Sequence, residues 1–66
     1  MNVGKSLKMA LAKRGMNQTQ MAAHLKCTVV WVNRIANSRS VSMSTVESLC
    51  DVLDMKVSEF LALGED

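Results

Sequence analysis

Residues 17–37 contain two short helical patterns separated by only a brief turn, and this spacing constrains the fold more than any other feature. Asn17 precedes Gln20 by three residues, the spacing of an approximate capping box, and predicts a helix of about two turns. Thr28 is a good N-cap for a second helix, which continues to Ala36. Helices so short and so tightly joined must pack directly on each other.

The segment also has the residues that such a pair needs for packing. A small residue is required early in the first helix, where the second crosses closely, and Ala22 supplies it. Apolar residues must hold the two helices together: Met21 and Leu25 lie on the first, and Val32 and Ile35 lie on the second. We therefore predict a helix-turn-helix, with its two helices roughly perpendicular.

Three further helices are predicted, because the chain has no proline and little alternation of the β type. The apolar spacing predicts a first helix over residues 4–14. Ser44 and Glu47 have the spacing of a capping box and open a fourth helix, and a short last helix begins at residues 56–58 and ends at Gly64. The inward stripe of the fourth helix comprises Val46, Leu49, Cys50 and Leu53. The fold class expected is all-α, with five short helices.

The length and the charge distribution of the chain limit the classes of function that it can have. The 66 residues suffice for one domain, expected over residues 1–66, and exclude barrels and multi-domain enzymes. Residues 1–46 carry seven basic residues and no acidic one, whereas residues 47–66 carry six acidic residues and one basic one. The net charge of +2 therefore conceals two oppositely charged parts, and the basic part favours an anionic partner.

Other classes of function find little support. No apolar run approaches the roughly 18 residues of a membrane span, and the N-terminus lacks the apolar core of a signal peptide, so we expect a cytoplasmic protein. Cys27 and Cys50 are then expected to be reduced, buried thiols. His24 and Cys27 make only half a metal site, and no nucleophile has a second His or an acid placed to serve it. We expect no enzymatic activity, cofactor, metal or small-molecule substrate.

The segment Asn17–Thr28 (NQTQMAAHLKCT), followed by Arg34–Asn37 (RIAN), resembles the phage repressor and Cro family of helix-turn-helix regulators. The likeness continues in the entry Gly15–Asn17 and in Thr45–Leu61, which is similar to the family's closing helices. The resemblance implies a five-helix lambda-repressor-like domain that binds double-stranded DNA, with its second and third helices as the helix-turn-helix.

Three positions depart from the family pattern. Lys26 stands where a turn glycine is usual, and a left-handed backbone there costs a non-glycine residue roughly 1–2 kcal/mol. Leu11 and Ala36 stand where some members have an Arg–Glu ion pair, and losing both partners together is compatible with the fold. Ser38 replaces a glycine after Asn37, so the course of that loop is left open.

The resemblance also implies which residues meet DNA, because the third helix of this family enters the major groove. The base-contacting residues expected are Val29, Val30, Asn33 and Arg34. The valine methyl groups can pack on thymine methyls and Arg34 can bind a guanine, so we predict a half-site with thymines beside a guanine. Packing of Val29 and Val30 against a protein is the alternative.

A second set of residues is expected to contact the DNA backbone. Its members are Gln18, Lys26, Thr28, Trp31, Asn37 and Arg39. Gln18 matches the family's phosphate-binding glutamine at a helix N-terminus. Trp31 is left open between packing on the DNA backbone and packing on a neighbouring helix. For Lys5, Lys8 and Lys13, phosphate contact and simple solvation also remain open.

A unit of this size makes few base contacts, so we expect a Cro-like regulator that binds its operator as a homodimer. The apolar end rimmed by acids supplies the expected dimer interface, Val57, Leu61 and Leu63, whereas Phe60 is assigned to the core. The alternative function is a protein-interaction module, such as an antirepressor or antitoxin, that uses the patch Val29-Val30-Trp31.

Overall fold

The computed structural model describes residues 2–65, which form five helices and contain no strand. The helices are α1 (Val3–Arg14), α2 (Gln18–Leu25), α3 (Val29–Ala36), α4 (Met43–Leu53) and α5 (Val57–Leu63). The predicted all-α class is therefore confirmed, and the boundaries of the predicted helices hold within about two residues. No helix in residues 2–65 has the length and hydropathy needed to cross a membrane.

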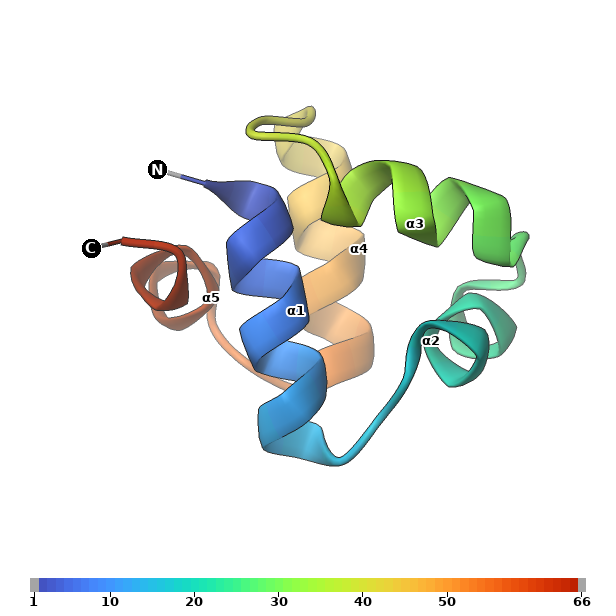
Figure 1. The fold of residues 1–66 in the computed structure, drawn as a ribbon. Helices are drawn as coiled ribbons and strands as arrows, with labels where there is room; N and C mark the ends of the chain where they lie inside the picture. The colour runs from blue at the N-terminus through green and yellow to red at the C-terminus, as the bar shows by residue number, and fades with distance from the viewer. Residues whose placement is uncertain (1, 66) are drawn as a thin grey trace.

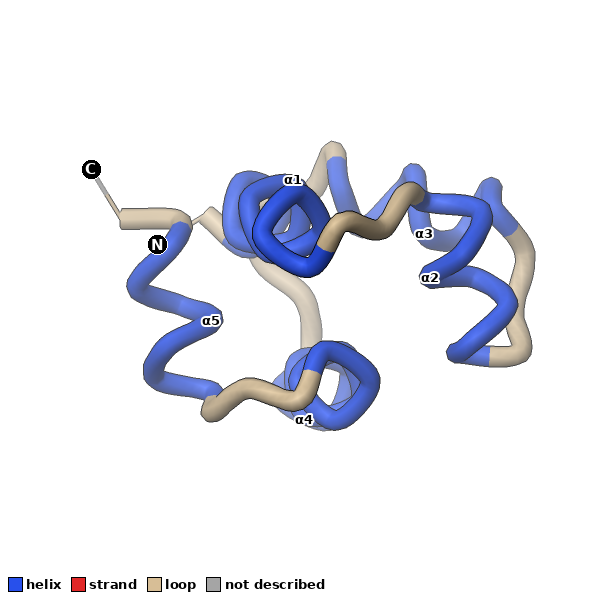
Figure 2. The backbone as a smooth tube through the Cα atoms, turned by 90° about the horizontal axis from the view of Figure 1, so that it is seen from below, coloured by secondary structure: helices blue, strands red, loops and turns tan. Residues whose placement is uncertain are grey.

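Two helices, α1 and α4, lie side by side at the centre of the molecule (Figures 1 and 2). The pair α2–α3 lies on one side of them and α5 lies on the other, and both views agree on this arrangement. The helix-turn-helix and the last helix are consequently at opposite ends of a molecule that measures 27 × 20 × 19 Å. The basic and acidic parts of the sequence match these two ends only in part. The basic helix α1 lies at the centre and contacts both α3 and α5.

One apolar core joins all five helices. Its fully buried large side chains come from every helix except α3, which contributes the smaller Val32. They are Leu7, Met21, Leu49, Leu53 and Phe60. The predicted stripe of α4 is buried in full, and so are Ala22, Val32 and Ile35 at the crossing of α2 and α3, which confirms the packing inferred from their spacing. Leu25 is half-buried at the edge of the core.

The predicted caps of the helix-turn-helix are confirmed. Oδ1 of Asn17 accepts from the backbone N–H of Gln20 at 2.8 Å, and Oε1 of Gln20 accepts from the N–H of Asn17 at 3.0 Å, which completes the capping box of α2. The hydroxyl of Thr28 accepts from the N–H of Trp31 at 3.2 Å and caps α3. Both helices therefore begin where their polar side chains indicate.

The cap predicted for α4 is wrong by two residues. Ser42, and not Ser44, is the N-cap, and its hydroxyl accepts from the N–H of Thr45. With Ser42 as cap, Val41 and Val46 take the two positions of a hydrophobic staple, and both pack on the core. With Ser44 as cap, one staple position would fall on Met43, which is 54% exposed.

The departures from the family pattern are accommodated locally. Lys26 ends α2 in the left-handed region at φ 56°, as the family's glycine would. Leu11 and Ala36 are both buried and apolar, so no charge is left unpaired where the ion pair would be. Ser38 does not need a positive φ, and its hydroxyl donates to the carbonyl of Arg34 at 2.7 Å.

The loop after α3 is fixed to the start of α1. The backbone N–H groups of Val3 and Gly4 donate to the carbonyl oxygens of Arg39 (2.9 Å) and Ser38 (2.8 Å). Any β-carbon on Gly4 would collide with the carbonyl oxygens of Ala36 and Ser38. The close approach of the two backbones is thus the reason for glycine at this position.

Candidate nucleic-acid interface

Helix α3 has a buried side and an outward side that follow from its periodicity. Successive residues advance by about 100° around a helix, so Val30 and Arg34 share one direction. Val32, Ile35 and Ala36 lie opposite to them and are buried. Val30 and Arg34 therefore point straight out of the molecule, and Val30 is 72% exposed.

The two flanks of α3 differ. Val29 and Asn33, one turn apart, lie on the flank next to α2, and Nδ2 of Asn33 donates to Oε1 of Gln18 at 3.2 Å. Trp31 lies on the other flank, where it lines a hollow with Leu25, Cys27, Thr28 and Ser48. The structure thus places Trp31 at the junction of α2, α3 and α4, and puts the α2 N-terminus beside Asn33.

Amide side chains form a short chain of hydrogen bonds along the Gln18 flank. Besides its bond to Gln18, Asn33 accepts at Oδ1 from Nδ2 of Asn37 at 3.1 Å. The same nitrogen of Asn37 lies 3.0 Å from the backbone carbonyl oxygen of Asn33. Three residues predicted separately for base and backbone contacts are therefore brought together by direct hydrogen bonds.

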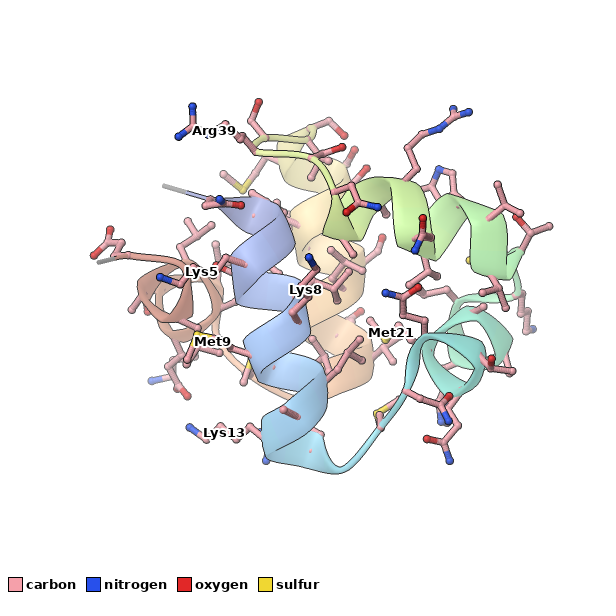
Figure 3. The ribbon with its side chains drawn as sticks, in the orientation of Figure 1. Lys5, Lys8, Met9, Lys13, Met21 and Arg39 are labelled. Carbon is pink, nitrogen blue, oxygen red and sulfur yellow. The ribbon has the colours of Figure 1, made fainter. Side chains whose placement is uncertain are left out.

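The loop after α3 borders a second hollow, which is basic. Its lining comes from the start of α1 and from the loop: Asn2, Lys5, Lys8, Ala36, Asn37, Ser38 and Arg39. Lys8 lies on the face of α1 that is turned to the viewer in Figure 3, and Arg39 lies at the top of the loop. Lys5, Lys8 and Arg39 come from two segments held together by backbone hydrogen bonds, so this hollow is bordered by three basic residues.

The predicted dimer residues lie on the opposite side of the molecule. Val57, Leu61 and Leu63 are half-buried and pack on the core of their own chain. Beside α5, α1 exposes Met9, which is 45% accessible (Figure 3). Met9 is not among the residues predicted for this surface, although it is the apolar member of an outward stripe between Lys5 and Lys13.

The two cysteines lie in different surroundings. Cys27 and Cys50 are both free, and Cys50 is buried as expected, whereas Cys27 is only half-buried beside Trp31. Burial raises the pKa of the Cys50 thiol above 9.0, and the neighbouring carboxylates of Asp51 and Glu47 raise it further. Cys50 thus stays protonated and inert in the core.

The chain matches the family model of the Cro/C1-type HTH DNA-binding domain over residues 6–66. It belongs to this family. The match includes α2, α3 and the loop after them. Comparison with curated proteins and with solved structures gives no match.

Proposed function

We propose that this Cro/C1-type domain is a sequence-specific transcriptional regulator that binds its operator as a homodimer, with α3 in the major groove. The observation that carries the proposal is the outward face of α3, where Val30 and Arg34 are exposed although Val32, Ile35 and Ala36 anchor the opposite face in the core. Arg34 offers the fork of donors that pairs with guanine, and Val29 and Val30 offer methyl groups to thymine.

Backbone contacts are proposed on both sides of α3. On one side, Gln18 and the free N–H groups of the α2 N-terminus bind one phosphate. On the other side, Arg39, with Lys5 and Lys8 across the basic hollow, binds the next phosphates along the strand. Thr28 uses its oxygen to cap α3, which leaves the hydroxyl hydrogen for a phosphate.

The experiment that tests this function is selection of duplexes from a random DNA pool, followed by sequencing. We expect a recovered site with two-fold symmetry, whose half-sites hold thymines next to a guanine. Arg34→Ala should lose the preference at one base pair per half-site, at a cost of about 1–3 kcal/mol. Lys13→Ala, which alters a cation on the side of α1 near α5, is the matched control and should keep the preference (Figure 3). Recovery of random sequence would refute the proposal.

The proposed dimer surface is the side formed by α5 and α1. It combines the half-buried Val57, Leu61 and Leu63 with the exposed Met9. Met9→Glu should shift sedimentation equilibrium towards the monomer, because a carboxylate would lose its water in the interface. Met43→Glu changes a similarly exposed methionine at the start of α4 and should leave the equilibrium unchanged. If the two variants have the same monomer–dimer equilibrium, the dimer does not form through this surface.

One observation favours the second candidate, a protein-interaction module. Val29, Val30 and Trp31 are adjacent and all are exposed, by 41%, 72% and 37%. Such a patch suits a protein partner as well as thymine methyls. The salt dependence of the affinity distinguishes the two functions. DNA binding should weaken steeply between 50 and 200 mM salt, because phosphate contacts release counterions. Binding to a protein through this patch should change little over the same range.

A further inference from the structure

We propose that Asn33 is a positioning residue, which fixes the orientation of the Gln18 amide so that its NH₂ group faces a DNA phosphate. The inference rests on the proposed function and deepens it. It replaces direct reading of a base by Asn33 with an indirect role, and it follows from the hydrogen bonds that link Gln18, Asn33 and Asn37.

The polarity of this network is set by one backbone atom. The carbonyl oxygen of Asn33 can only accept, so the Asn37 atom 3.0 Å away must be the donor Nδ2. That nitrogen is also 3.1 Å from the Asn33 side chain, whose nearer atom must therefore be the acceptor Oδ1. Nδ2 of Asn33 is then left to face Gln18 at 3.2 Å, and only Oε1 of Gln18 can meet it.

These bonds fix the orientation of the Gln18 side-chain amide. Its oxygen is held by Asn33, so its Nε2 group, with two hydrogens, is directed away from α3. Phosphate oxygens only accept, and the backbone N–H groups at the start of α2 are donors as well. With the opposite orientation, the amide oxygen would face the phosphate and oppose binding.

The same bonds limit what Asn33 and Asn37 can do themselves. An asparagine that reads adenine presents its oxygen and its nitrogen together to the base, whereas one donor and one lone pair of Asn33 are already used within the protein and direct its amide towards Gln18 and Asn37. Nδ2 of Asn37 is directed towards α3, so the side chain has only its oxygen to offer to DNA, and an oxygen cannot donate to a phosphate. The loop's phosphate contact therefore falls to Arg39 rather than to the Asn37 side chain.

A double-mutant cycle tests this role with DNA. Asn33→Ala should weaken binding to the selected operator and to a scrambled duplex by the same factor, about 3- to 10-fold for one lost hydrogen bond. In a Gln18→Ala background, Asn33→Ala should have no further effect, because its only route to DNA has been removed. A loss confined to the operator, or additive losses, would show that Asn33 reads a base and would overturn the proposal.

A measurement without DNA separates failure of this inference from failure of the proposed function. The side-chain NH₂ resonances of Gln18, seen by ¹⁵N NMR, should shift in Asn33→Ala and in Asn37→Ala. Those of Gln20, whose oxygen is held by the backbone of Asn17, should not shift. Unchanged Gln18 resonances would overturn the proposal even if the protein binds DNA. Shifted resonances in a protein that binds neither duplex would overturn the role of Asn33 together with the proposed function.

Discussion

Nε of Arg14 donates a hydrogen bond to the backbone carbonyl oxygen of Leu53, 2.9 Å away, and so joins the last turn of α1 to the last turn of α4. Nη2 of the same guanidinium donates to the carbonyl of Asp54 at 3.0 Å. The last carbonyls of a helix have no partner within it, and they form the negative end of its dipole. One fork-shaped cation on α1 therefore caps α4.

We predict that Arg14→Met lowers the free energy of unfolding by about 1–2 kcal/mol, because two charge-assisted hydrogen bonds are lost at a partly exposed site. Urea denaturation monitored by circular dichroism measures this change. Lys13→Met removes the adjacent, exposed cation and should change stability by less than about 0.5 kcal/mol. An equal loss in both variants would mean that net charge, and not the cap, is responsible.

Gly4 offers a test of the contact between α1 and the loop after α3. Gly4→Ala should destabilise the fold by about 1–3 kcal/mol, because its β-carbon meets two carbonyl oxygens of the loop. The backbone amide resonances of residues 36–39 should shift as the loop moves. Gly15→Ala is the control, because a β-carbon at Gly15 meets open space although the backbone φ is +66°. This variant should lower the free energy of unfolding by about 1–2 kcal/mol and leave those resonances in place.

The helices and the core could be predicted from the sequence because their determinants are local. Caps such as Asn17 and Thr28, and the apolar spacing within each helix, act over three or four residues. The start of α4 was missed because two serines lie two residues apart, and the choice depends on whether Val41 or Met43 packs on the core.

The interactions that shape the candidate interface are not local, and most could not be predicted. Asn33 and Gln18 are 15 residues apart, and Arg14 and Leu53 are 39 apart, so each pair meets only after the helices pack. The resemblance to a family supplied positions along α3, but not the hydrogen bonds that occupy Asn33. In the same way, the flank on which Trp31 lies depends on where α4 passes.

The buried thiol of Cys50 should make stability depend on alkaline pH. Its pKa is raised in the folded state, so above pH 9 the unfolded chain loses this proton more readily than the folded chain. Stability should therefore fall as pH rises from 9, by at most about 1.4 kcal/mol per pH unit from this group. Cys50→Ala should show a shallower fall in chemical denaturation at pH 8 to 10, whereas Cys27→Ala should keep the original slope. Parallel slopes for all three proteins would contradict the assignment.

Lys26 and Asp54 end α2 and α4 in the same left-handed conformation, with φ of 56° and 53°. Lys26→Gly should raise the free energy of unfolding by about 1 kcal/mol, since glycine adopts this conformation without strain. It should also weaken DNA binding and make it less steeply dependent on salt, because the phosphate contact that the family resemblance implies for Lys26 is removed. Asp54→Gly relieves the same strain at the C-terminal end of α4 and removes no cation, so it should stabilise the fold without reducing affinity for DNA. If both variants bind DNA as the original protein does, Lys26 is simply a solvated turn residue and not a phosphate contact.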